Sequence, residues 1–240
     1  MKLNLGCGKD YIDGWVNVDF YDDSKCDEVH DLEEFPWPWE SDTVSEILIK
    51  HTLEHLGADW KVYIKILQEM YRVCEDDATI EVHVPSPWHW NYTSDPTHVR
   101  PVTPDGLNLF SKEHCQKCID EGKSETPFAM IYDVDLRPHD VVWKYDEYWR
   151  NKIDRGEVQQ SQMEELHSMY RNVVTEFQIP VAVVKSEETE KKHRYEERLH
   201  LPDGIGNPVD APSNIIRYLN EKIEQEYIMF LSCRVRGFLS

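Results

Sequence analysis

The sequence has few basic residues. Lys and Arg number 26 against 46 Asp and Glu in 240 residues, a formal net charge of -20 at pH 7. Proteins that bind nucleic acid without sequence preference neutralise phosphates with Lys and Arg, so a nucleic-acid partner is disfavoured. No apolar run approaches the roughly 20 residues of a membrane-spanning helix, and Lys2 leads directly into an apolar segment without a signal peptide. We therefore expect a cytoplasmic protein with no membrane partner.

Cysteine and glycine are also scarce, with 6 and 10 residues. In a cytoplasmic protein the thiols are expected to stay reduced, which excludes a disulfide framework. Hydrophobic residues make up 40% of the chain and include 8 Trp and 12 Tyr, so the chain is not disordered as a whole. Its length favours one elaborated domain over two independent ones.

Apolar strands and a helix-length segment alternate in the first half of the chain. Strands are predicted at 2–6, 14–20, 45–50 and 78–84, and apolar residues at helical spacing predict an amphipathic helix over 60–74. This alternation predicts a Rossmann-like α/β fold, a doubly wound and mostly parallel sheet. In such sheets ligands bind beyond the carboxyl ends of the strands.

The second half is less regular. Ser111 and Gly122 predict the two ends of a helix, and an apolar run over 128–136 predicts a strand. Pro180 predicts that the strand over 175–185 lies at a sheet edge. Three further elements are expected, namely a helix over 163–174, a helix beginning at Ser213 and a strand over 227–235.

Four segments in order carry a resemblance. They read "LNLGCG", "GWVNVD", "HDLEEFPWPWESDTVSEILIKHTLEHL" and "LQEMYRVCEDDATIEVHVPSP", and they fall within about residues 2–110. This set resembles the class I S-adenosylmethionine-dependent methyltransferases, in particular type 11-like members with a very short first crossover. The resemblance implies a methyltransferase domain over 1–185 with an acceptor-side insertion at about 85–110. Residues 186–240 would form a C-terminal extension, packed on the core or at an oligomer interface.

The glycine turn itself argues for this cofactor over a dinucleotide. Gly6 and Gly8 let a ligand approach the backbone closely, and Asp19 at the next strand end can accept hydrogen bonds from ribose hydroxyls. The dinucleotide fingerprint needs a third glycine and places its acid about 20 residues further on. Here Asp19 lies 13 residues after Gly6 and "KDYIDG" stands where the third glycine is expected, which argues against NAD or FAD.

The resemblance implies a full cofactor site for S-adenosylmethionine, with S-adenosylhomocysteine as the product. Asp31 and Leu32 would lie near the adenine, His51 would flank the methyl donor, and Glu54 and His55 would support it. The implied cofactor-binding residues are Asn4, Gly6, Cys7, Gly8, Asp19, Phe20, Asp31, Leu32, His51, Glu54 and His55.

The acceptor side is expected in "PSPWHWNYTSDPTHVRPV", where His98 or His89 could act as a base. Asp95 would orient a histidine, and Arg100 would grip an anionic acceptor. In the alternative, Asp95 and Pro96 form a turn, and His98 hydrogen-bonds to the backbone. The predicted reaction is methyl transfer to an O or N atom of a small molecule or saccharide.

Two other functions remain open. A non-catalytic assembly protein could keep the fold and use 186–240 to engage a partner or form a homo-oligomer. A zinc hydrolase could use the His and Cys residues between His83 and Cys118, but one Cys-x-x-Cys pair, Cys115 and Cys118, is half of a usual structural zinc site. We therefore expect no metal.

Overall fold

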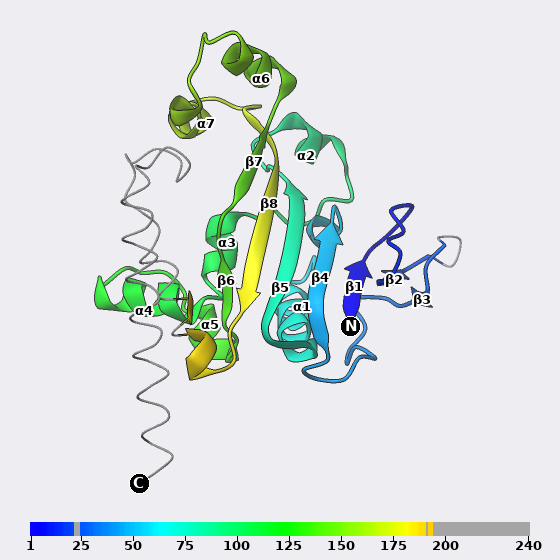
Figure 1. Cartoon of the computed structure of the whole chain (residues 1–240). Coiled ribbons are helices and arrows are strands. Elements are labelled where there is room, and N and C mark those ends of the chain that lie inside the picture. The colour runs from blue at the N-terminus through cyan, green and yellow to red at the C-terminus, as the bar shows by residue number, and fades with distance from the viewer. Residues whose placement is uncertain (22–24, 191, 194–240) are drawn as a thin grey trace, which may run out of the picture. The chain divides into compact units, whose positions relative to one another are not determined.

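The computed structural model of the chain describes residues 1–21, 25–190, 192 and 193. The chain divides after Glu190, and the fold described here is that of Met1–Glu190. This part of the chain is built around one sheet that runs through the whole body (Figure 1). The helix and strand expected after Ser213 lie outside the described residues. Within the described residues, no helix is both long and apolar enough to cross a membrane.

The sheet is mixed, and its N-terminal half is parallel. Its order is β3-β2-β1-β4-β5-β8-β6, and β7 pairs with β8 beyond the end of β6. Strands β1 to β5 pair with one another in parallel, whereas β8 is antiparallel to β5, β6 and β7. This confirms the predicted Rossmann-like sheet. The strands are β1 (Lys2–Leu5), β2 (Val16–Asp19), β3 (Glu28–Val29), β4 (Val44–Lys50), β5 (Cys74–Pro85), β6 (Leu136–Pro138), β7 (Val142–Tyr145) and β8 (Val174–Val183).

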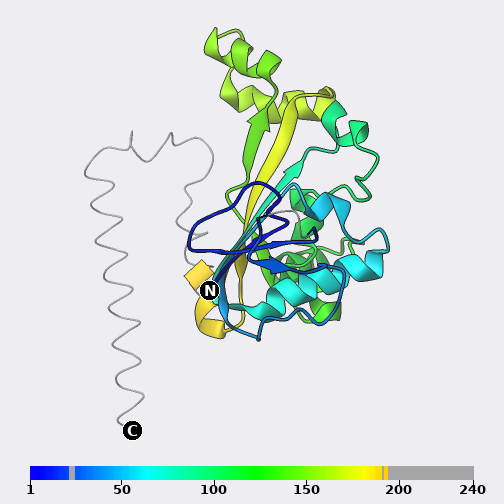
Figure 2. The same cartoon turned by 90° about the vertical axis from the view of Figure 1, so that its right-hand side faces the viewer.

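Helix α1 (Trp60–Val73) covers one face of the sheet, as the cyan helix in Figure 2 shows. Asp59 caps it by accepting a hydrogen bond from the Lys61 N–H, and its apolar stripe is buried in the core. The other helices are η1 (Leu53–His55), α2 (Trp90–Ser94), α3 (Pro104–Asn108), α4 (Lys112–Asp120), α5 (Phe128–Tyr132), α6 (Glu147–Asp154), η2 (Gln160–Gln162) and α7 (Met163–Met169).

The connection from β1 to β2 contains no helix, as the short first crossover predicts. Buried side-chain amides hold it instead. Asn17 accepts hydrogen bonds from the Asn4 amide and the Ile12 N–H, and its own amide donates to Asp27. Asn4 also donates to the Asp10 carbonyl. This network fixes the loop that follows the glycine turn, because buried polar groups that are fully bonded rigidify their surroundings.

The strand predicted over 128–136 is wrong, because most of this run is helical. Residues Phe128–Tyr132 form α5, in which the Phe128 ring stacks on Phe110 with centroids 5.4 Å apart. Asp133 ends the helix in the left-handed region at φ 50°. Only Leu136 of the predicted strand enters the sheet. A short apolar run fits either a strand or a buried helix, and here packing against the neighbouring aromatic decides.

The edge position predicted for 175–185 is also wrong, because β8 lies inside the sheet. The carbonyl of Pro180 accepts from the His139 N–H, so the absent N–H of Pro180 faces the same side. On that side β8 pairs with β6 along one part of its length and with β7 along another. Residues 139–141, between these two strands, belong to neither. The missing donor therefore falls in a break between two short partner strands, which lets proline occupy an internal strand.

Candidate functional site

The candidate site lies where the strand order reverses, beyond the carboxyl ends of β1 and β4. Gly6 follows β1, and His51 and Thr52 follow β4. The Thr52 hydroxyl donates to the Gly6 carbonyl at 3.4 Å, so the two loops touch. The topology thus brings the glycine turn next to the segment that carries Glu54 and His55.

Gly6 and Gly8 are needed for different reasons. Both have left-handed backbones, at φ 66° and φ 51°. A Cβ on Gly6 would lie 2.2 Å from the Thr52 Oγ1, whereas a Cβ on Gly8 would meet nothing within 4 Å. Gly6 therefore makes room for the protein's own Thr52, and Gly8 leaves open space in front of the loop. Of the two, Gly8 is the position that a ligand could approach.

Replacing Gly6 by Ala should therefore destabilise the protein more than replacing Gly8 by Ala. Both variants carry the cost of a left-handed alanine, about 1–2 kcal/mol, and Gly6→Ala adds about 1–3 kcal/mol for overpacking against Thr52. Urea denaturation of both variants measures the difference in the free energy of unfolding. Equal losses would show that Thr52 does not restrict Gly6.

Asp19 is the last residue of β2, and its carboxylate bonds the glycine turn after β1 and the segment after β2. Its Oδ2 accepts from the Gly8 N–H at 2.7 Å, and its Oδ1 accepts from the Tyr21 N–H at 3.0 Å. An ionised carboxylate has about four acceptor sites, so each oxygen keeps one for a ligand hydroxyl. The Phe20 side chain beside it is 58% exposed, an aromatic surface on which a planar base could stack.

The other residues predicted on this side of the cofactor have structural contacts of their own. The Asn4 side chain is buried and both of its bonds stay within the protein. Cys7 is also buried, and burial raises the pKa of its thiol to about 11. Asp31 caps a turn by accepting from the Glu33 N–H, and the Leu32 carbonyl accepts from the Trp37 indole. These contacts fix the loops that surround the turn.

His51 holds a strained position directly after β4. Its backbone is left-handed at φ 50°, which is costly for a residue with a side chain and tends to occur at functional sites. Its Nε2 lies 2.8 Å from the Glu176 carboxylate on β8. The hydrogen bond to Glu176 and, secondarily, the nearby Glu54 carboxyl group raise the pKa of His51 to about 9. Sequence reasoning missed Glu176, although an acid in the largely apolar stretch "VTEFQIPVAVV" was a usable signal.

Glu54 is a buried carboxyl group with neither oxygen hydrogen-bonded. Its side chain is 1% exposed. The nearest ring nitrogens are the His51 Nδ1 at 3.6 Å and the His98 Nε2 at 4.0 Å, both beyond hydrogen-bond length. An unpaired buried polar group is costly and calls for an explanation such as a ligand or ion.

The insertion places His98 close to Glu54, with its Nε2 4.0 Å from the carboxyl. The Val99 and Arg100 N–H groups donate to the Glu54 carbonyl, which ties the insertion to η1. His98 Nδ1 lies 2.7 Å from the Tyr92 carbonyl, and the His98 and His55 rings are 4.7 Å apart. The sequence therefore led to two histidines and a carboxyl that the fold brings together.

Asp95 does orient a histidine, as predicted for this residue. The histidine is His55, and the contact runs through the Thr97 hydroxyl. Asp95 accepts from both the N–H and the hydroxyl of Thr97, and these bonds lower the pKa of Asp95. The Thr97 Oγ1 lies 2.9 Å from the His55 Nδ1. The turn that the sequence offered as the alternative for Asp95 is thus present and also orients a ring.

His89 and Arg100 are bound within the protein. His89 caps α2 by accepting from the Asn91 N–H, and its Nε2 lies 3.3 Å from Asp146. Arg100 donates to the Gly57 carbonyl at 2.6 Å, and its guanidinium lies over the Tyr63 ring. His89 thus joins the insertion to the start of α6, and Arg100 joins it to Gly57 and α1.

The Cys-x-x-Cys pair does not act as one unit. The Cys115 thiol donates to the Leu109 carbonyl, whereas Cys118 lies 3.4 Å from the His114 Nε2. That nitrogen is 2.9 Å from Glu125, so His114 already has an ionic partner. Burial raises the pKa values of both thiols. Core packing on α4, with one exposed ion pair, explains these residues.

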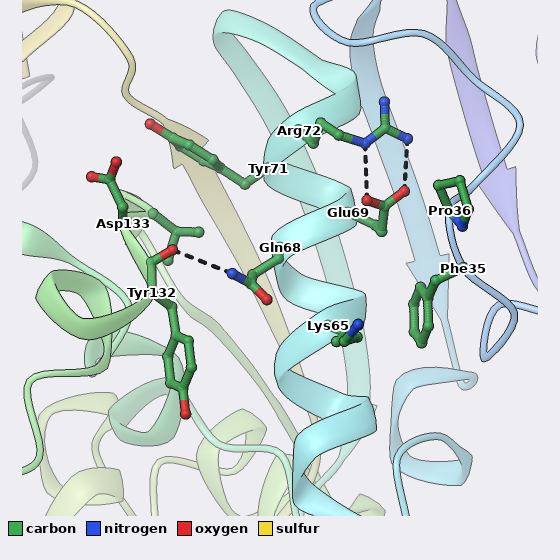
Figure 3. Close-up of a pocket in the computed structure, with 10 residues that line it drawn as sticks. Phe35, Pro36, Lys65, Gln68, Glu69, Tyr71, Arg72, Tyr132 and Asp133 are labelled. Carbon is green, nitrogen blue, oxygen red and sulfur yellow. Dashed lines mark hydrogen bonds and ion pairs between the residues drawn. The ribbon is translucent and has the colours of Figure 1, made fainter.

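A separate groove of about 520 Å³ runs along α1 (Figure 3). Two of its charged groups are paired with each other, because Arg72 forms an ion pair with Glu69 and also donates to the carbonyls of Trp37 and Trp39. The Gln68 amide donates to the Tyr132 carbonyl across the groove (Figure 3). These bonds hold surface segments against α1, so the groove has a structural explanation.

No family model and no curated protein matches the sequence. Several solved structures are similar. An S-adenosylmethionine-dependent methyltransferase from Archaeoglobus fulgidus is 18% identical over 75% of this chain and 85% of its own, with a TM-score of 0.47. One from Methanosarcina mazei is 12% identical over 77% and 92%, with a TM-score of 0.44. Geranyl diphosphate C-methyltransferase from Streptomyces coelicolor, solved with S-adenosylhomocysteine, is 14% identical over 76% and 69%, with a TM-score of 0.39.

Proposed function

We propose that the protein is an S-adenosylmethionine-dependent methyltransferase that acts on an O or N atom of a small molecule or saccharide. The observation that carries the proposal is the arrangement at the strand reversal. A left-handed glycine turn bonded to Asp19 lies against Thr52, two residues before the buried Glu54. Ligand sites of parallel α/β sheets lie at such reversals.

The residues present fit this cofactor. Asp19 keeps one acceptor site on each oxygen for the two ribose hydroxyls, and Phe20 offers an exposed aromatic face to the adenine. Gly8 leaves open space at the turn for the amino-acid end. When bound, S-adenosylmethionine supplies an electrophilic methyl group that a nucleophile takes by in-line displacement.

The acceptor side supports proton removal from the nucleophile. The Tyr92 carbonyl can only accept, so the His98 Nδ1 carries a proton, and in the neutral ring the Nε2, 4.0 Å from Glu54, is the acceptor. A nucleophile placed at this nitrogen could lose its proton to His98. The net charge of -20 favours a neutral or cationic acceptor over a polyanion such as nucleic acid.

His98→Ala should lower kcat for methyl transfer by about 100-fold or more, the usual contribution of a general base. Its affinity for S-adenosylhomocysteine should stay unchanged, because the variant leaves Asp19 and the turn intact. Acceptors are screened by the release of S-adenosylhomocysteine, and the cofactor is titrated by calorimetry.

The matched control is His114→Ala, which removes a histidine from α4 whose side chain is 30% exposed. It should leave both kcat and cofactor affinity at wild-type values. If His98→Ala turns over the acceptor as fast as the control, His98 has no part in proton transfer.

A further inference from the structure

We propose that Glu54, His55 and His98 form a binding site for one divalent transition-metal cation. Each of the three offers a ligand atom, and these atoms all lie within 4.8 Å of one another. Two imidazoles and a carboxylate suit cations such as Zn²⁺, Mn²⁺ or Fe²⁺. Ligands at 2.0–2.2 Å from a metal are about 3–4 Å apart, so binding needs only a small contraction.

The unpaired carboxyl of Glu54 is the first independent reason for this assignment. It is buried to 1% exposure, and neither oxygen has a hydrogen-bond partner. His51 lies closest, but its Nε2 is bound to Glu176 and its Nδ1 stays 3.6 Å from Glu54. A cation between Glu54 and His98 would give the carboxyl the direct contact that His51, at 3.6 Å, does not make.

The hydrogen bonds of the two histidines are the second reason. The His98 Nδ1 donates to the Tyr92 carbonyl, so in the neutral ring the lone pair lies on the Nε2, 4.0 Å from Glu54. The Thr97 hydroxyl donates to Asp95 and so accepts from the His55 Nδ1, which in the neutral ring leaves the lone pair on the His55 Nε2. A neutral imidazole with one nitrogen left as acceptor is the form in which histidine binds a metal.

The same contacts form the outer shell that metal-binding histidines normally have. Such histidines donate their second N–H to a carbonyl or carboxylate, which fixes the ring and makes the ligand more basic. Tyr92 supplies this contact directly to His98, and Asp95 supplies it to His55 through Thr97. The Val99 and Arg100 N–H groups hold the insertion on the Glu54 carbonyl. The ligand set is therefore positioned before any cation binds.

Three protein ligands leave coordination positions open for an oxygen of another molecule. If the proposed methyl transfer holds, such a cation would hold and acidify an acceptor hydroxyl, in place of proton removal by His98 itself. Only this last step rests on the proposed function. Metal binding can be measured without any acceptor or cofactor.

The test is titration of the metal-free full-length protein with Co²⁺, followed by its visible absorption and by calorimetry. The wild type should bind one equivalent without thiolate-to-metal charge transfer. Glu54→Gln and His98→Asn should each weaken binding at least 100-fold, and Thr97→Val should weaken it about 10–100-fold, the usual effect of losing an outer-shell partner. His89→Ala should bind Co²⁺ like the wild type, provided that circular dichroism shows each variant folded.

A second cluster of possible ligands provides the competing outcome. His114, Cys118 and Glu125 also place ligand atoms within 4.8 Å of one another. Charge-transfer absorption that Cys118→Ser removes, with no effect of Glu54→Gln, would place the metal there and overturn the proposal. So would the absence of stoichiometric binding. If the wild-type protein does not bind S-adenosylhomocysteine, the proposed function is contradicted, but the result of this metal titration is unaffected.

Discussion

Replacing Arg137 by Leu should lower the free energy of unfolding by about 3–5 kcal/mol. Arg137 lies on β6, and its guanidinium binds Asp135 through two hydrogen bonds of 3.0 and 2.7 Å. Both side chains are less than 10% exposed. Removing the arginine leaves a buried carboxylate without its counter-ion, which costs more than the pair itself contributes. Urea denaturation measures the loss.

Two further variants make this prediction specific. Asp135→Asn combined with Arg137→Leu removes the unpaired charge and should recover part of the stability. Asp133→Asn breaks the exposed ion pair with Lys112, in which Asp133 is 90% exposed, and should cost less than about 1 kcal/mol. If Arg137→Leu has the same free energy of unfolding as Asp133→Asn, the buried ion pair contributes no more to stability than the exposed one, and the prediction is wrong.

Replacing Asp19 by Asn should weaken the binding of S-adenosylhomocysteine about 100-fold. Hydrogen bonds to a charged group contribute about 1.5–3 kcal/mol each, and the ribose is expected to donate two of them to this carboxylate. Asparagine keeps one acceptor oxygen, which can still bond the Gly8 N–H of the turn, whereas the bond from the Tyr21 N–H is lost. Calorimetric titration of both proteins gives the two dissociation constants.

The control for charge is Asp13→Asn, which removes an exposed acid from the same loop. It should bind the cofactor product like the wild type, and both variants should unfold at similar urea concentrations. Equal affinity of Asp19→Asn and Asp13→Asn would mean that Asp19 serves only to hold the Gly8 N–H.

Elements set by local pattern could be predicted from the sequence. The apolar stripe from Trp60 and the cap at Asp59 lead to α1, and the halt at Gly6 marks the end of β1. The position of the turn at the strand reversal follows from the parallel order alone. These features depend on neighbours a few residues away, which is why periodicity and turn residues reveal them.

Features set by distant pairing could not be predicted. The internal position of β8 depends on β6 and β7 meeting it at separate registers, which Pro180 alone does not reveal. The histidines and cysteines close in sequence suggested a metal site, yet the fold sends Cys115 to the Leu109 carbonyl. The ligand set proposed here instead joins η1 to the insertion, and Glu54 carries no sign in the sequence that it is left unpaired.

The central claim is that the turn formed by Gly6, Gly8 and Asp19 binds S-adenosylmethionine. The most direct test is calorimetric titration of the wild-type protein with S-adenosylhomocysteine, beside a parallel titration with NAD⁺. We predict one equivalent of S-adenosylhomocysteine bound with a micromolar Kd and no binding of NAD⁺. No binding of S-adenosylhomocysteine, or tighter binding of NAD⁺, would contradict the account.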